Sequence, residues 1–414
     1  MRYATVVAAV LGLLASSAAG AEAKSFGGMI PDLPSPHAAF HQPVAYAANL
    51  PYGGGPVLHS NRTHLIFWQP AGSGMKFEPG YEALIEQFLR RVAADSHHPG
   101  NVYGLTGQYT DAQGPAAYAS SYGGATVDTD ALPRNGCIEP PITGPGWNVC
   151  LTDKQLQAEI EHVVQDDHLP TGPTDVYFLV TPKGLGSCTD TSSTSCALGG
   201  RMSGYCAYHS QSADGEVLYA VIPYDAVAGH CQSGNPRPNG STADPTISTI
   251  SHEHSEMVTD PSEDAWIDSS GREDGDLCIE SFGPAIGGSG AGAWNEQIHG
   301  GHYYLQEEWS NADNGCSPRA KPARLSFKTN LRAGTSSVAF SAHGTTSHGP
   351  VVSYMWFFGD GRSAHGAGVS HRYHRAGRYR VVLRATDNWA NWTYVAETLT
   401  VTGRARRAAD AKSG

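Results

Sequence analysis

The spacing of hydrophobic residues predicts two kinds of structural unit along this chain. In the first part, residues 81–92 and 152–164 place apolar side chains at helical spacing. The second of these helices begins behind Thr152, which forms a capping box with Gln155. Apolar runs with strand composition occur at residues 63–68, 175–180, 205–209 and 217–222. Alternating helices and strands predict an α/β or α+β domain of roughly 250 residues or more.

The pattern changes from about residue 321. Short alternating runs lie between turn signals at residues 338–340, 353–357, 379–383 and 397–401. That spacing is typical of a small β-sandwich. Residues 100–150 and 260–320 show little periodicity, so we expect irregular chain there.

The two ends of the chain differ in composition from the segments between them. Arg2 precedes an apolar run and then small residues, which predicts a cleavable signal peptide over residues 1–23. The run is shorter than the ~20 apolar residues that a membrane span needs. We therefore expect a secreted protein without a transmembrane segment. The polar tail, residues 404–414, is expected to be disordered.

The chain has 8 cysteines, all in its first part. An even number without a CxxC motif favours disulfides over a thiolate zinc cluster in an exported protein. Proximity in the sequence suggests the pairs Cys137–Cys150, Cys188–Cys196, Cys206–Cys231 and Cys278–Cys316.

The formal net charge of −12 is unevenly distributed. Residues 1–319 carry 13 Lys and Arg against 35 Asp and Glu, whereas residues 320–414 carry 14 against 4. The negative total excludes a uniformly basic nucleic-acid binder. The basic second part would suit an anionic polysaccharide, cell wall or membrane surface, or it could simply be a soluble face. We expect a monomer.

A third predicted helix, residues 244–259, carries the candidate chemistry. At about 100° per residue, His252, Glu256, Asp260 and Glu253 fall within roughly 100° of one another. The opposite side is apolar and includes His254, which we therefore expect to be a core residue.

His252 and Glu256, at i and i+4, can hold one cation between them. Glu253 is placed to act as general base on a bound water, as in the zinc-peptidase motif HExxH with Glu in place of the second His. Zinc accepts carboxylate oxygen, so the exchange is chemically allowed. A zincin-like arrangement around this helix is one form that the domain could take. The alternative is a solvated acidic helix face.

A third ligand would come from Asp260 or from the loop 268–276, which offers Glu273 and Asp276. The same loop could instead wrap a calcium ion by itself, because Ca²⁺ takes several oxygen ligands from flexible loops. His302 is a further catalytic candidate, and Tyr304 another, for orienting substrate or stabilising transition-state charge.

Scattered blocks lie between about residues 50 and 318, namely Tyr52–Leu58, Leu65–Trp68, Phe88-Leu89, Ser251–Pro261, Ala265–Asp268, Glu273–Cys278, and Leu305–Asn311 with Cys316. Together these blocks resemble the EXORDIUM-like (phosphate-induced protein 1) family. The family usually has an aliphatic residue where His254 stands, which supports a buried His254. Its plant members are extracellular and associated with growth and the cell wall, but the resemblance implies no biochemical activity.

The C-terminal unit resembles a PKD domain, an immunoglobulin-like sandwich. The resemblance rests on Trp356–Gly361, His371-x-Tyr373, Gly377-x-Tyr379-x-Val381 and Ala385-x-Asp387. It implies an accessory role, because PKD domains often accompany secreted hydrolases as spacers or adhesion modules. We accordingly expect residues 24–320 to form a metallohydrolase domain and residues 321–403 a PKD domain.

Two functions fit the sequence. The first is a secreted hydrolase, a zinc peptidase acting on protein or peptide, with His252, Glu256 and one of Asp260, Glu273 or Asp276 as ligands. The second is a non-catalytic extracellular protein that binds cell-wall polysaccharide, with structural calcium or no metal.

Overall fold

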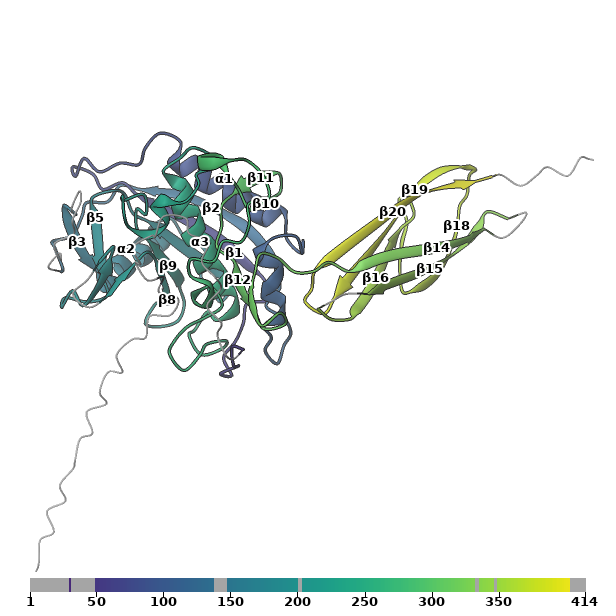
Figure 1. The fold of residues 1–414 in the computed structure, drawn as a ribbon, viewed down its shortest axis with the longest axis horizontal. Helices are drawn as coiled ribbons and strands as arrows, with labels where there is room; N and C mark the ends of the chain where they lie inside the picture. The colour runs from purple at the N-terminus through teal and green to yellow at the C-terminus, as the bar shows by residue number, and fades with distance from the viewer. Residues whose placement is uncertain are drawn as a thin grey trace, which may run out of the picture.

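The computed structural model describes residue 30 and residues 49–137, 147–199, 203–331, 335–345 and 348–402. The predicted signal peptide and C-terminal tail lie outside these described residues. An α/β domain and a β-sandwich form two separate lobes, joined by the chain between β13 and β14 (Figure 1). No helix in the described ranges has the length and apolar character that a bilayer crossing requires.

A five-stranded sheet, ordered β2-β1-β4-β9-β8, lies at the centre of the first lobe (Figure 1). Its strands are β1 (Asn61–Trp68), β2 (Ser120–Asp128), β4 (Asp175–Val180), β8 (Tyr208–Gln211) and β9 (Leu218–Ile222). All neighbours pair in parallel except β8, the edge strand, which runs antiparallel to β9. Continuous burial of β4 and β9 explains their uninterrupted apolar runs. The expected mixed α/β class is confirmed.

Two features of this region differ from the sequence prediction. Residues 100–150, expected to be irregular, contain β2 and the 3₁₀ helix η1 (Val102–Gln108). The sequence of β2, SSYGGATVD, offers few apolar residues because this edge strand is only partly buried. The strand predicted at 205–209 is interrupted, since β7 ends at Tyr205 and β8 begins at Tyr208.

The three predicted helices are present as α1 (Tyr81–Ala94), α2 (Asp153–Asp166) and α3 (Ala243–Thr259). The capping box forms, with the Thr152 N–H donating to Gln155 Oε1 at 3.0 Å. Helix α3 packs against α1, β8 and β9. Every residue of α3 is buried, so the alternative of a solvated acidic helix face is wrong.

A second sheet, ordered β3-β5-β6-β7, and two hairpins complete the first lobe. The sheet consists of β3 (Val149–Thr152), β5 (Leu185–Cys188), β6 (Ser195–Ala197) and β7 (Ser203–Tyr205). The hairpins are β10 (Glu296–Ile298) with β11 (Gly301–Tyr303), and β12 (Glu308–Ser310) with β13 (Gly315–Ser317). Further 3₁₀ turns are η2 (Cys231–Gly234), η3 (Asp276–Cys278) and η4 (Gly290–Gly292).

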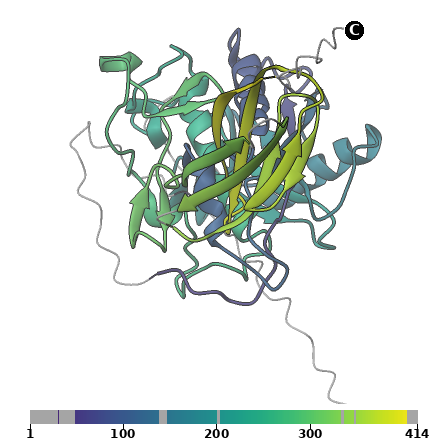
Figure 2. The ribbon, with the colours of Figure 1, turned by 90° about the vertical axis from the view of Figure 1, so that its right-hand side faces the viewer.

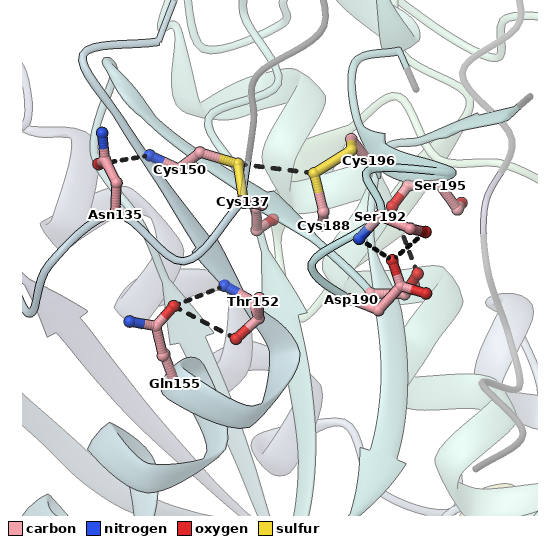
Figure 3. The surroundings of a disulfide bond; sticks show 12 residues. Asn135, Cys137, Cys150, Thr152, Gln155, Cys188, Asp190, Ser192, Ser195 and Cys196 are labelled. Atoms are coloured by element: carbon pink, nitrogen blue, oxygen red, sulfur yellow. Dashed lines mark hydrogen bonds between the residues drawn. A yellow bond between two sulfur atoms is a disulfide. The ribbon is translucent and has the colours of Figure 1, made fainter. Parts of the chain in front are cut away.

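Four disulfides cross-link this lobe, and all four sequence-based pairs are confirmed. Cys137–Cys150 and Cys188–Cys196 lie side by side, with Cys150 Sγ 3.5 Å from Cys188 Sγ (Figure 3). Cys278–Cys316 ties η3 to β13. The bond therefore fixes the end of the acidic loop 268–276 to the chain that leads into the second lobe.

The second lobe is the predicted β-sandwich, seen end-on in Figure 2. One sheet has β14 (Arg324–Leu331), β15 (Ser337–Thr345) and β18 (Gly368–Arg372). The other has β16 (Val351–Phe357), β17 (Ser363–His365), β19 (Gly377–Asp387) and β20 (Trp392–Val401). Trp356 is buried between them against Phe327 and Phe340, as expected of a core residue.

The turn between β19 and β20 docks on η1 of the first lobe. Trp389, 5% exposed, packs against Leu105 and Ala320. Asn391 Nδ2 donates to the Gly104 carbonyl at 2.9 Å, and the His97 ring stacks on Trp392 at 4.1 Å. These contacts give the two lobes a specific interface in addition to their covalent connection.

Candidate metal centre

Helix α3 directs three acidic or imidazole side chains to one buried place. His252, Glu253 and Glu256 all have 0% exposure. One turn separates His252 from Glu256, and His252 Nε2 lies 3.0 Å from Glu256 Oε1. The helical spacing predicted from the sequence therefore brings these side chains together.

Segments from elsewhere in the chain complete the cluster. The edge strand β8 contributes His209, the loop before η3 contributes Glu273, and η3 contributes Asp276. Gln306 and Glu308 come from β12 and the residues before it. All five side chains are at most 5% exposed. The cluster thus depends on the tertiary fold rather than on a single motif.

Two groups of metal-ligating side chains occur within the cluster. One consists of His252, Glu253 and Glu256, and the other of His209, Glu256 and Glu273. In each group, one donor atom per residue lies within 4.8 Å of the others. Ligands around a tetrahedral zinc, at about 2.1 Å from the metal, are roughly 3.3 Å apart. The measured separations therefore suit a shared cation after small adjustments.

Asp276 extends the first group. Its Oδ1 lies 3.7 Å from His252 Nε2, and its N–H donates to Glu256 Oε1 at 3.0 Å. Two other candidate ligands from the sequence analysis, Glu256 on α3 and Glu273 in the loop 268–276, also lie in the cluster. Asp276 is consequently in position to serve as the third ligand that the motif on α3 needs.

Many donor atoms of this cluster lack a hydrogen-bond partner among the described residues. They include His209 Nε2, His252 Nε2, Glu253 Oε1, Glu256 Oε2, Asp276 Oδ1 and both carboxylate oxygens of Glu273 and Glu308. Buried polar atoms are nearly always paired, because leaving one unpaired costs roughly 1–3 kcal/mol. So many in one place make this cluster a candidate cation site.

Burial dominates the electrostatics of the cluster. It lowers the pKa of His209 to about 3 and lowers the pKa of His252 below its ordinary value. Burial, and then repulsion by Glu256, raises the pKa of Glu253 well above normal. The pKa values of Glu256, Glu273, Asp276 and Glu308 are raised for the same two kinds of reason, burial first and neighbouring carboxylates second.

Gln306 and Gly275 hold the His252 ring in place. Gln306 Nε2 donates to the Gly275 carbonyl at 2.7 Å and lies 3.1 Å from His252 Nδ1. A Cβ on Gly275 would lie 2.8 Å from His252 Cε1 and 2.9 Å from Glu256 Oε1. The backbone of the acidic loop can approach α3 this closely only because residue 275 has no side chain.

Two other acids have structural partners. Asp260 Oδ1 accepts the N–H groups of Asp264 and Ala265 at 2.8 and 2.7 Å, and burial raises its pKa to about 7. Asp268 pairs with Arg272 at 2.7 Å. Asp260 belongs to neither donor group, although its Oδ2 has no hydrogen-bond partner in the described ranges. The loop 268–276 turns its buried acids toward α3.

The remaining candidates lie elsewhere. His302 is exposed on β11 and stacks on Trp294 at 4.1 Å, and Tyr304 stacks on Phe282 at 5.1 Å. Neither belongs to the donor groups. His254 is fully buried, with Nε2 2.9 Å from Asn61 Oδ1 and its ring beside Tyr103 and Phe178. It has the core position predicted for it.

The sequence analysis did not identify His209, Gln306 or Glu308 as site residues. His209 lies in a predicted strand, where a single histidine has no partner at recognisable spacing. Gln306 begins a short polar run before Trp309 in one of the blocks that carried the family resemblance. That run was the available signal, although the sequence could not show that it faces α3.

The cluster is closed to solvent. None of its members exceeds 5% exposure, and surface hollows lie along α2 and beside the N-terminal ends of α1 and α3 instead. Gly275 and its neighbours cover the His252 side. Any substrate could reach these groups only after a covering segment moved.

Comparison with known proteins bears on the second lobe. Residues 319–402 match the family model described as PKD domain. Two similar solved structures are the PKD1 domain of Vibrio anguillarum Epp, at 27% identity, and the PKD1 domain from Vibrio cholerae metalloprotease PrtV, at 32%. Each alignment covers 20% of this chain. The Epp alignment covers 99% of the other chain with a TM-score of 0.20, and the PrtV alignment covers 96% with a TM-score of 0.18. No curated protein matches the chain.

Proposed function

Because the chain carries a C-terminal PKD domain, an accessory module found in extracellular proteins such as proteases, we propose that it is a secreted metal-dependent hydrolase. A zinc peptidase is the specific form that we favour. The observation that carries the proposal is the group of buried donor atoms without hydrogen-bond partners around α3. The resemblance of residues 50–318 to the EXORDIUM-like family, and cleavage of residues 1–23 on export, belong to the same proposal.

The donor set favours zinc over calcium. Calcium takes oxygen ligands, whereas each donor group here contains an imidazole. Imidazole with carboxylate is a usual zinc environment. His252, Glu256 and Asp276 would hold the ion, which when bound acts as a Lewis acid and lowers the pKa of water.

Glu253 would act as the general base. Its Oε2 lies 3.2 Å from His209 Nδ1, while Oε1 has no hydrogen-bond partner in the described part of the chain. Oε1 would accept the proton of the attacking water and return it to the leaving group. Burial raises the pKa of Glu253 above its ordinary value, which makes the ionised carboxylate a stronger proton acceptor.

Glu253→Gln tests the mechanism. The amide keeps the shape and a hydrogen-bonding oxygen but cannot accept the proton, so we expect zinc to be retained and hydrolysis of casein or cell-wall peptides to fall at least ~100-fold. His254→Leu is the matched control, since it removes a buried histidine of α3 outside the donor groups and should leave both properties unchanged. Undiminished hydrolysis by Glu253→Gln would exclude the mechanism.

The complete burial of the cluster favours a second candidate function. A structural ion needs no open coordination position, and the protein would then be a non-catalytic extracellular binder of cell-wall polysaccharide. Its basic residues 320–414 would provide attraction to an anionic polymer. Retention on peptidoglycan, chitin or cellulose together with inactivity of the zinc-loaded protein would support this function over hydrolysis.

A further inference from the structure

We propose that the buried centre binds two divalent cations, with the Glu256 carboxylate bridging them. This inference rests on the proposed function, because it concerns the same centre, and it specifies how that centre is built. The two donor groups share Glu256 and otherwise come from different elements. One cation would lie between His252 and Asp276, and the other between His209 and Glu273.

The two oxygens of Glu256 face different partners. Oε1 lies 3.0 Å from His252 Nε2 and accepts the Asp276 N–H at 3.0 Å. Oε2 lies 3.7 Å from His209 Nδ1 and has no hydrogen-bond partner among the described residues. Each oxygen therefore lies beside a different imidazole, and Glu256 is the residue that the two donor groups share. A carboxylate that belongs to two donor groups can bridge two cations.

In the second donor group, a carboxylate orients the His209 ring, as is typical of metal-ligating histidines. Glu253 Oε2 lies 3.2 Å from His209 Nδ1, so this carboxylate can accept the proton on that nitrogen. The lone pair is then on Nε2, which lies 3.7 Å from Glu273 Oε2. Carboxylates commonly orient metal-ligating histidines through the other ring nitrogen in this way. Nε2 and both Glu273 oxygens lack hydrogen-bond partners in the described ranges.

Charge balance also favours two cations. Five buried carboxylates of the cluster have oxygens without hydrogen-bond partners, namely Glu253, Glu256, Glu273, Asp276 and Glu308. No ion pair of the described residues joins a lysine or arginine to any of them. One divalent cation neutralises two carboxylates and two cations neutralise four. Buried charges are tolerated only when paired, so a single cation would leave most of the cluster uncompensated.

A pair of cations would define the chemistry of the centre more closely. Two-metal hydrolase sites hold their ions about 3.5–4 Å apart and stabilise both the attacking and the leaving oxygen. The donors of each group lie within 4.8 Å of one another around the common Glu256, which is compatible with such a spacing. The pair predicts a substrate whose scissile group can contact both ions.

The test is metal stoichiometry of the full-length, disulfide-bonded protein after equilibration with zinc and gel filtration. We expect about two zinc ions per chain in the wild type and about one in His209→Ala, in Glu273→Gln and in His252→Ala. Glu256→Gln should lower both occupancies, while His254→Leu keeps both. Glu273→Gln hardly changes the shape of the side chain, so this variant should fold. It therefore still tests the loss of the second cation if His209→Ala does not fold.

A spectroscopic measurement tests the bridge itself. Protein loaded with manganese should show the electron paramagnetic resonance of an exchange-coupled pair, and Glu273→Gln should show an isolated ion instead. One zinc per wild-type chain, unchanged in Glu273→Gln, would overturn the two-cation proposal but leave the proposed hydrolase intact. No bound zinc at all would overturn both.

Discussion

Removal of the proposed metal should destabilise the first lobe, and more strongly at higher pH. Without a cation, the buried carboxyls must either ionise in an apolar site or remain protonated. Keeping one carboxyl with an ordinary pKa near 4.4 protonated costs about 4 kcal/mol at pH 7.5 and about 1.5 kcal/mol at pH 5.5. Five carboxyls of this kind lie in the cluster. Even two of them would offset much of the ~5–15 kcal/mol by which domains are stable.

The direction of the pH dependence follows from the pKa shifts. The carboxyl pKa values are raised in the folded metal-free protein, so the folded state binds more protons than the unfolded state. Stability of the metal-free protein should therefore fall as pH rises above about 4.4. Burial lowers the pKa of His209 to about 3 in the folded state, so the folded protein keeps this imidazole neutral. The stability that the neutral imidazole contributes is lost progressively as the pH falls below about 6.5. A neutral His209 is needed with or without metal, so this second effect should largely cancel in the comparison.

Thermal unfolding of the zinc-loaded and chelator-treated protein, at pH 5.5 and pH 7.5, measures this effect. We expect chelation to lower the melting temperature of the first lobe by at least about 10 °C at pH 7.5 and by less than half as much at pH 5.5. In Trp389→Ala, where the two transitions should separate, the PKD domain provides an internal control because it contains none of the cluster residues. An unchanged midpoint at pH 7.5, or a larger decrease at pH 5.5, would refute the charge argument.

Two further substitutions test other parts of the structure. Trp389→Ala should remove roughly 3 kcal/mol of packing between the lobes and separate their calorimetric transitions, whereas Tyr394→Ala, at a residue that is 52% exposed, should not. Coincident transitions in Trp389→Ala would show that Trp389 is not what couples the two lobes. Gly275→Ala should reduce zinc affinity at least ~10-fold by pushing the loop away from His252 and Glu256, because ligand geometry controls metal affinity. Zinc titration checks this, and wild-type affinity would mean that the loop adjusts without cost.

The sequence predicted those parts of the fold that depend on local pattern. Helix α3 and its placement of His252, Glu253 and Glu256 follow from a period of 3.6 residues. Strand β4 is bounded by the residues predicted for it. Strand β2 was missed because an edge strand needs few apolar side chains, and a Gly-Gly pair in its middle weakened the pattern further.

The candidate site was predictable only in part. The candidate ligands on α3 have recognisable spacing, but His209 reaches the cluster by lying on the antiparallel edge strand, which depends on strand order. The sequence also could not predict that the acidic face of α3 is buried, because charged residues usually mark a solvated surface. For Asp260, a suitable helical angle did not reveal that its Oδ1 accepts two backbone N–H groups, whereas its Oδ2 has no hydrogen-bond partner among the described residues.

The Cys278–Cys316 bond has a consequence for how the protein must mature. Cys278 closes the short turn that begins at Asp276, so the position of this acidic side chain depends on an oxidation between residues 38 positions apart. Disulfides persist in oxidising compartments and are rare where glutathione keeps thiols reduced. Loading of the proposed metal should accordingly be the last step of assembly, after oxidation. Chains made in a reducing cytosol would reach the metal with an unfinished site, however abundant the ion.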